Sequence, residues 1–206
     1  MKAILKFNGS YLKAGGGVLT KQIGTGTAVI GGKEYPTVVI GNQEWLAENL
    51  DYAFEETNPE SYYTYYDNSD TYKDRGLLYN HYAAMDLHQN RATLCPGWHL
   101  PTVAEFEALI AYIGADAGKK LKSTTGWSND GNGTDNYGFN GKPAGLYADG
   151  GVGYTALDIQ AWYWTQNSYS NVERYTRVLT SSNDSFVSGL ADKLSRCSIR
   201  LIKDSA

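Results

Sequence analysis

The stretch that decides the fold is residues 95–105, which read Cys-Pro-Gly-Trp-His-Leu-Pro-Thr-Val-Ala-Glu. Thr102 and Glu105 have the spacing of a capping box, in which each side chain bonds a free backbone N–H of the other residue. One helical face then carries Phe106, Leu109, Ile110 and Ile113. Because Gly114 is a typical stop signal, the sequence predicts a helix that begins after Thr102 and ends before Gly114.

Upstream, residues 28–50 predict a compact β meander. The pairs Gly31-Gly32 and Gly41-Asn42 are turn signals, and residues 37–40 are β-branched throughout. Leu78, Tyr82 and Met85 are spaced as on one helical face, so a helix is expected over residues 77–88. Between these elements, residues 52–75 hold six tyrosines among small polar residues, which predicts an ordered surface loop.

Downstream, residues 123–153 are rich in Gly, Asn and Asp and have no strong period. So long a stretch in a compact domain is normally functional or wrapped on the core. The last fifty residues predict short strands at 162–165, 175–179, 185–187 and 198–202.

Composition excludes several function classes. The chain of 206 residues has 18 basic and 22 acidic residues, a net charge of -4, and no basic block, so nucleic acid is not an expected partner. It has no apolar run long enough to span a membrane. No signal-peptide core follows Met1, so we expect cytoplasmic synthesis or a phage virion rather than standard secretion. Cys95 and Cys197 form either one disulfide or two buried free thiols.

Ordered motifs along residues 28–203 resemble one family. They are residues 39–50 (Val-Ile-Gly-Asn-Gln-Glu-Trp-Leu-Ala-Glu-Asn-Leu), residues 95–102 with Glu105, Leu121-Lys122-Ser123 with Trp127, residues 133–139, residues 143–145, Tyr163-Trp164-Thr165 and Ser198-Ile199-Arg200. This pattern is similar to the Fibrobacter succinogenes major paralogous domain, a family of bacterial surface and secreted proteins. The resemblance implies that Trp45, Trp98, Trp127 and Trp164 belong to the core.

The resemblance also implies a fold and a domain organisation. The family is related to the C-type lectin-like fold, so we expect an α+β domain over residues 28–206, with two helices, a small twisted antiparallel sheet and long loops. Residues 1–27 would form an N-terminal strand and a Gly-rich extension. A narrower resemblance is to variable proteins diversified by retroelements, many of them phage tail tips, which carry a patch rich in Asn, Tyr, Ser and Asp near the carboxyl end.

These features predict non-catalytic recognition of a protein or glycan on a cell surface. Tyr offers rigid contact area, whereas Ser, Asn and Gly adapt their hydrogen bonds. The predicted ligand-binding residues are Tyr163, Gln166, Asn167, Tyr169, Asn171, Arg174, Tyr175, Arg177, Asn183 and Ser185. The alternatives are a structural component of a bacterial surface or virion, and a cysteine enzyme of the formylglycine-generating type.

The enzyme alternative lacks a recognisable catalytic motif. Formylglycine-generating enzymes use two cysteines near the carboxyl end, whereas Cys95 precedes the predicted helix. His99 is expected to be a packed, hydrogen-bonded residue, and His81 and His88 to lie on a helix surface. We therefore expect no catalysis.

For metals, the oxygens of Asp130, Asn132 and Asp135 suit calcium by type and alternation, but the same residues also form ordinary turns. No other cofactor is implied.

Overall fold

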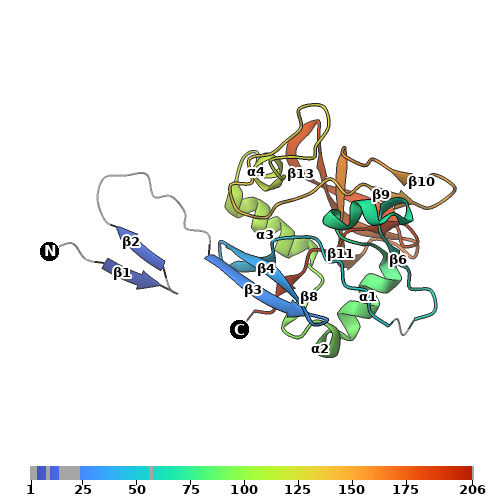
Figure 1. Cartoon of the computed structure of the whole chain (residues 1–206), viewed down its shortest axis with the longest axis horizontal. Helices are drawn as coiled ribbons and strands as arrows, with labels where there is room; N and C mark the ends of the chain where they lie inside the picture. The colour runs from blue at the N-terminus through green and yellow to red at the C-terminus, as the bar shows by residue number, and fades with distance from the viewer. Residues whose placement is uncertain (1–3, 8–9, 14–23, 56–57, 206) are drawn as a thin grey trace.

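The computed structural model describes residues 4–7, 10–13, 24–55 and 58–205 (Figure 1). Strands β1 (Ile4–Phe7) and β2 (Ser10–Lys13) pair as an antiparallel hairpin. The rest of the described chain forms three antiparallel sheets with thirteen strands, and its helices are few and short. None of the helices in the described residues is both long and apolar enough to cross a membrane.

The first sheet contains the predicted meander. Its strands lie in the order β3 (Gly24–Ile30), β4 (Lys33–Ile40), β5 (Gln43–Leu46), β15 (Ile202–Lys203) and β8 (Trp98–His99). The turns at Gly31 and Gly41 have φ values of 58° and 69°, which only glycine adopts readily. The meander is confirmed, and the carboxyl-terminal strand β15 joins it to the segment before the capped helix.

The second sheet joins short strands from distant parts of the chain. Their order is β10 (Gly153–Thr155), β9 (Leu146–Ala148), β14 (Arg196–Cys197), β7 (Leu78–Asn80) and β6 (Tyr63–Thr64). The expected helix over residues 77–88 is wrong at its start, because Leu78 lies in β7. Helix α1 (His81–Gln89) begins only where the Asn80 side chain accepts a hydrogen bond from the N–H of Ala83, and α2 (Arg91–Leu94) follows.

The described parts of the tyrosine-rich segment, residues 52–55 and 58–75, connect the first sheet to the second. After β6 the segment forms the 3₁₀ helices η1 (Tyr66–Asn68) and η2 (Asp70–Arg75). Tyr63 packs on Phe54 and Tyr79, whereas Tyr62 is exposed.

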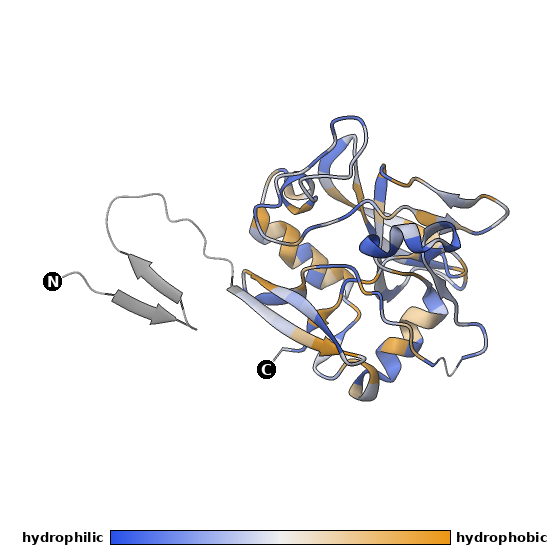
Figure 2. Ribbon diagram, in the orientation of Figure 1, coloured by the Kyte–Doolittle hydropathy of each residue, from blue (hydrophilic) through white to orange (hydrophobic). Residues whose placement is uncertain are grey.

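The third sheet consists of β11 (Gln160–Ser168), β12 (Glu173–Thr180) and β13 (Asn183–Asp192). The strands predicted near residues 162–187 are confirmed and are longer than expected. Tyr163 and Leu179 point into a core shared with helix α3, whereas Trp164 belongs to a second core with Tyr79 and α1. This sheet therefore separates two apolar cores. Figure 2 shows the hydrophobic residues of α3, which belong to the first of them, in orange.

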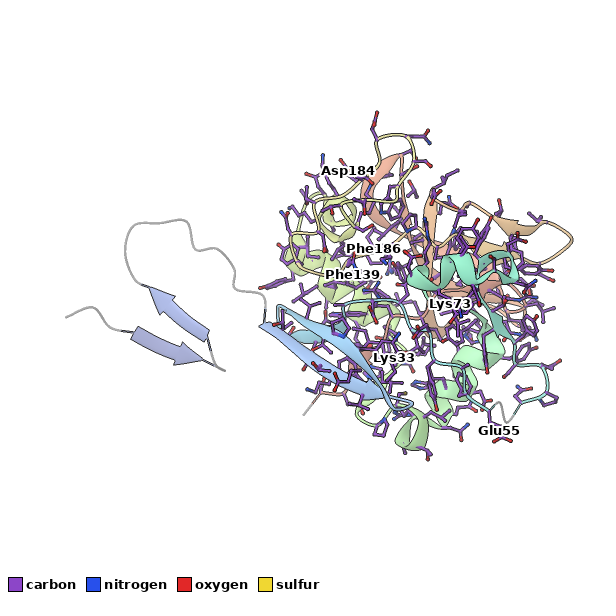
Figure 3. All side chains as sticks on the ribbon, in the orientation of Figure 1. Lys33, Glu55, Lys73, Phe139, Asp184 and Phe186 are labelled. Carbon is purple, nitrogen blue, oxygen red and sulfur yellow. The ribbon has the colours of Figure 1, made fainter. Side chains whose placement is uncertain are left out.

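The capped helix is α3 (Val103–Ile113), and both arms of its capping box form. Phe106, Leu109 and Ile113 are buried, and Gly114 follows the last turn. A short helix, α4 (Ala117–Leu121), packs against β13. Near it, Phe139 and Phe186 meet edge to face in the interior, with ring centroids 6.3 Å apart (Figure 3). The four tryptophans expected in the core are buried there.

The expected fold class is wrong. We expected an α+β, C-type lectin-like domain with two helices and a small sheet, but the described residues form a mostly β structure with three sheets. The discrepancy arises because β6, β8, β14 and β15 are two residues long, too short to show a strand period. The predicted domain boundary after residue 27 falls within β3, and part of the N-terminal extension lies outside the described residues.

Candidate functional site

The predicted ligand-binding residues lie along the third sheet but differ widely in exposure. Asn167, Tyr169, Asn171, Asn183 and Ser185 are exposed; Gln166, Arg174 and Tyr175 are half-buried; Tyr163 and Arg177 are buried. Tyr163 packs edge to face on Phe139 in the interior. It is therefore a core residue and cannot form part of an exposed surface.

The sheet register places these residues at two separate ends. Glu173 pairs with Asp192 at one end of β12, and Thr180 pairs with Asn183 at the other. With a rise of roughly 3.3 Å per strand residue, the two ends are about 20 Å apart. Asn183 and Ser185 therefore do not join the residues of the β11–β12 turn. They lie beside Asp184, which Figure 3 shows at the edge of the molecule.

An aromatic and aliphatic surface forms at the β11–β12 end. The rings of Tyr169 and Tyr175 meet edge to face with centroids 5.3 Å apart, and Tyr175 lies directly opposite Leu190 on β13. Tyr169 is 54% exposed, Val172 53% and Leu190 37%. We call Tyr169, Asn171, Val172, Tyr175 and Leu190 the hairpin surface. Val172 and Leu190 are not among the predicted ligand residues, because they are neither polar nor aromatic. Only the strand register places Leu190 beside Tyr175.

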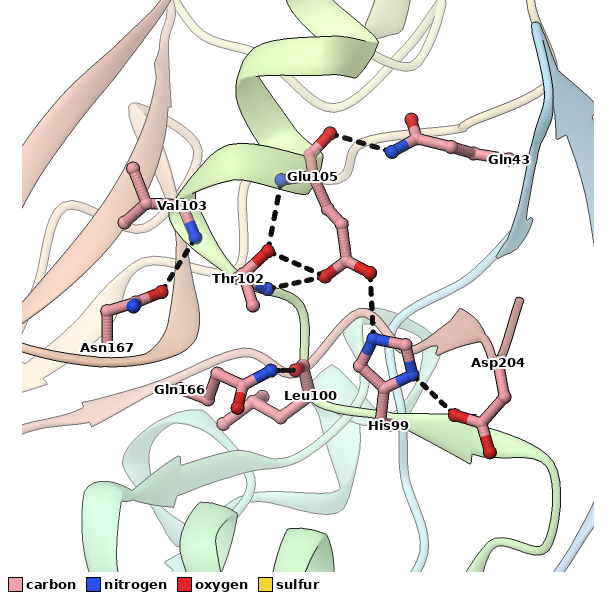
Figure 4. Close-up of polar contacts among 9 residues, drawn as sticks. All are labelled: Gln43, His99, Leu100, Thr102, Val103, Glu105, Gln166, Asn167 and Asp204. Atoms are coloured by element: carbon pink, nitrogen blue, oxygen red, sulfur yellow. Dashed lines mark hydrogen bonds and ion pairs between the residues drawn. The ribbon is translucent and has the colours of Figure 1, made fainter.

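Two predicted ligand residues instead hold the hairpin to the N-terminus of α3 (Figure 4). The Asn167 Oδ1 accepts a hydrogen bond from the N–H of Val103 at 2.8 Å. The Gln166 Nε2 donates to the carbonyl of Leu100 at 3.1 Å, and its backbone N–H donates to that of Pro101. The side chains of these two residues therefore attach the hairpin to the start of α3, and their hydrogen-bonding groups are used within the protein.

The two predicted arginines point to opposite faces of β12, because they are three positions apart and side chains alternate along a strand. The Arg177 guanidinium is buried and forms an ion pair with Glu107 of α3 at 2.9 Å. The Arg174 guanidinium donates to the carbonyls of Ser170 and Glu173, at 2.7 and 2.9 Å. Arg177 fixes the sheet to α3, and Arg174 braces the turn.

His99 on β8 links the N-terminal turn of α3 to the carboxyl-terminal segment after β15. Its Nε2 lies 2.9 Å from the Glu105 Oε1, and its Nδ1 lies 2.6 Å from the Asp204 Oδ1 (Figure 4). The hydrogen bond with Glu105 is the main cause that raises the pKa of His99, and Asp204 adds to it. The prediction of a hydrogen-bonded structural histidine is confirmed.

The other two histidines differ from their predicted placement. His81 is buried against the edge of Trp164, with ring centroids 5.2 Å apart, so the prediction of a helix-surface position is wrong. Burial lowers the pKa of His81 to about 4. His88 is half-buried, and burial lowers its pKa as well.

The two cysteines are free thiols, and both are buried. Burial raises the pKa of Cys95 to about 12 and raises that of Cys197 well above its usual value. Because the thiolate is the nucleophilic form, this environment disfavours the reactive state of each thiol.

The predicted calcium residues form turns in this structure. The Asn132 Oδ1 accepts from the N–H of Trp127, and the Asp135 Oδ1 accepts from that of Asn140 at 2.7 Å. Asp130 is exposed in a left-handed turn conformation. A search of the described residues found no group of three or more His, Cys, Asp or Glu residues arranged to hold a metal. Calcium binding stays a prediction.

Comparison with known proteins identifies the family. The model of the Fibrobacter succinogenes major domain matches residues 38–203. The chain belongs to this family. No curated protein and no solved structure matches the chain.

Three motifs of this Fibrobacter succinogenes major domain meet at Arg200. Its guanidinium is fully buried and donates to the carbonyls of Leu46 and Phe139 and to the Asn49 Oδ1. Burial lowers its pKa, and no carboxylate of the described chain lies within ion-pair distance. The Arg200 charge is therefore held by neutral oxygens, an arrangement that sequence spacing does not reveal.

Lys122 is a second buried cation of the family motifs. It holds the β12–β13 turn, at the end of the third sheet opposite to the hairpin surface. Its Nζ donates to the carbonyls of Thr180 and Asn183, both at 3.0 Å, and lies over the ring of Trp127. Burial lowers the pKa of Lys122. Both ends of the β11–β13 sheet are thus attached to the family framework.

Proposed function

We propose that this protein recognises a protein partner, without catalysis, through the hairpin surface. The observation that supports the proposal is the contact of exposed Tyr169 with half-buried Tyr175, which lies opposite Leu190. The side chains of Asn167, Arg174 and Gln166 hold the turn that carries this pair. A surface ordered before binding loses little conformational entropy when a partner binds.

The residue types favour a protein over a glycan. Tyrosine is enriched at the centre of protein interfaces because it combines a large apolar area with a hydroxyl. Val172 and Leu190 add aliphatic area without hydrogen-bonding groups. A sugar bound there would have hydroxyls without hydrogen-bond partners. Asn171, at the tip of the turn, supplies an adaptable polar contact.

The proposal includes diversification by a retroelement and a phage origin for the gene. The structure sharpens what such diversification must look like. Substitutions at exposed Tyr169 and Asn171 would change the surface alone, whereas substitutions at Asn167 or Arg177 would break contacts with α3. Sequencing of the locus should find a near-identical template repeat beside a reverse transcriptase, with variation at the first pair and not the second. A locus without the repeat rules out this part of the proposal.

Binding is tested with Tyr169→Ser/Leu190→Ser against the matched control Val29→Ser, an exposed apolar residue on β3. Immobilised wild-type protein and both variants are exposed to extracts of candidate host cells. We expect one protein to be retained by the wild type and the control and lost from the double variant, with affinity then measured by calorimetry. Equal retention by all three proteins, or retention by none, contradicts the proposal.

A further inference from the structure

Tyrosines and one arginine form a row across the second sheet, away from the hairpin surface. Tyr154 on β10 pairs with Tyr147 on β9, and Tyr147 pairs with Arg196 on β14. Arg196 pairs in turn with Asn80, whose N–H donates to the carbonyl of Tyr62. Directly opposed residues point to the same face of a sheet. We call Tyr62, Tyr147, Tyr154 and Arg196 the tyrosine row.

The guanidinium of Arg196 lies close to the aromatic rings of the row. Its central carbon lies 4.2 Å from the ring centroid of Tyr62 and 3.9 Å from that of Tyr147. Its Nη1 donates to the hydroxyl of Tyr154 at 3.1 Å, and that hydroxyl donates to the Asn68 Oδ1. A planar guanidinium stacks well on aromatic faces. The ring contacts and the hydrogen bond to Tyr154 together restrain the position of the guanidinium.

Arg196 differs from the other anchoring arginines in lacking an anionic or carbonyl partner. Arg75 pairs with Asp158 at 2.6 Å and Arg177 pairs with Glu107 at 2.9 Å, and backbone carbonyls hold Arg174. Within the described residues, the hydroxyl of Tyr154 is the polar group bonded to the Arg196 side chain. The Arg196 side chain is half-buried, and none of its nitrogens is both buried and unbonded.

We propose that the tyrosine row binds a carboxylate-bearing glycan, a chain of uronic acid residues. In the described residues, the Nε and Nη2 of Arg196 make no hydrogen bond, and this pair of donors matches a carboxylate in bidentate geometry. Tyr62 is 47% exposed and offers a flat ring on which the C–H face of a neighbouring sugar can stack. The hydroxyl of Tyr154 and the amide of Asn68 supply polar groups at the rim, where sugar hydroxyls lie.

The choice of a glycan over an acidic peptide rests on the shape of the row. The row consists of flat phenol rings around one cation, and its members are all polar at their edges. A peptide would also need a groove or an open strand edge to satisfy its backbone groups. The charge complementarity is specific, because the chain as a whole has a net charge of -4 and does not attract anions in general.

The probe is trigalacturonate, with its methyl ester as a matched ligand that keeps the sugar rings and removes the charge. Binding is measured by calorimetry for the wild type, Arg196→Gln, Arg196→Lys and Tyr62→Ala. Arg91→Gln is the control variant, because Arg91 is exposed on α2 and its substitution removes the same charge. Thermal melting verifies that each variant is folded.

We expect trigalacturonate to bind the wild type and Arg91→Gln equally, and to bind Arg196→Gln at least about tenfold more weakly. Arg196→Lys should bind weakly as well, because an ammonium lacks the fork. Tyr62→Ala should also lose affinity, and the methyl ester should not bind. No binding to the wild type, or equal affinity for Arg196→Gln, overturns the inference. Equal affinity for a tri-glutamate peptide also overturns the choice of a glycan. None of these outcomes depends on the hairpin surface.

Discussion

The side chain of Asn167 on β11 accepts a hydrogen bond from the backbone N–H of Val103, the first residue of α3, at 2.8 Å. This contact joins the end of β11 to the N-terminus of the capped helix. A residue that looks like a ligand contact in the sequence is thereby part of the support of the surface, and its substitution has consequences for stability.

We predict that Asn167→Ala lowers the free energy of unfolding by about 1 kcal/mol, because a free N–H of the helix loses its acceptor. Asn171→Ala, at the exposed tip of the same turn, is the control and should leave stability unchanged. Urea denaturation of the two variants and the wild type measures both values. Equal stability of the two variants would show that Asn167 does not support α3.

Arg200→Met should destabilise the domain far more. The substitution keeps an unbranched side chain of moderate length but leaves the carbonyls of Leu46 and Phe139 without a donor. We expect a loss of roughly 3 kcal/mol or more in the free energy of unfolding. Chemical denaturation measures it, with Arg91→Met as a surface control. A loss within the range of the surface control would mean that water replaces the guanidinium.

The free energy of unfolding should depend on pH through the protonation of His99. Its pKa is raised in the folded state by Glu105 and Asp204, so folding favours the protonated ring. The stabilisation is fully present below the unfolded pKa of about 6.5 and is lost as pH rises through the folded pKa. Unfolding free energies between about pH 6 and about pH 9 should therefore fall in the wild type and fall less in His99→Gln. Parallel profiles for the two proteins would contradict the assignment.

His81 should act with the opposite sign. Burial and the nearby charge of Arg174 lower its pKa to about 4, so folding favours the neutral ring. Stability from this residue is present above the unfolded pKa of about 6.5 and is lost as pH falls toward the folded pKa. His81→Gln should flatten the acid side of the stability profile. The pKa itself is measured by NMR titration of the His81 ring, and a value at or above about 6.5 would refute the prediction.

Much of the local structure was predictable, because caps and turns depend on residues that are close together in the chain. The capping box of Thr102 and Glu105 fixed the start of α3, and Gly31 and Gly41 fixed the turns of the meander. The fold class was not predictable in this way. Strand β14 exists because Arg196 and Cys197 find partners on β7 and β9, and nothing within two residues signals such pairing.

The residues of the candidate site were predicted in part. Which of them share one end of the sheet depends on the strand register, which the sequence does not reveal. Exposed Tyr169 and Asn171 and half-buried Tyr175 do lie on one hairpin, but Asn183 lies at the far end of the same sheet. Composition cannot separate an amide that faces solvent from the amide of Asn167, which faces the backbone of α3. The tyrosine row was not predicted, because its members come from three distant segments: Tyr62, the β9–β10 hairpin with Tyr147 and Tyr154, and Arg196.

The attachment of the third sheet at both ends has a practical consequence. Lys122 holds the β12–β13 turn by two carbonyls, and Asn167 holds the end of β11. Extra residues placed between Ser170 and Asn171 would disturb the hydrogen bonds from the N–H groups of Val172 and Glu173 to the Ser170 Oγ but should leave the strands in register. The turn between β11 and β12 is therefore a suitable insertion site for displaying foreign peptides of varied length.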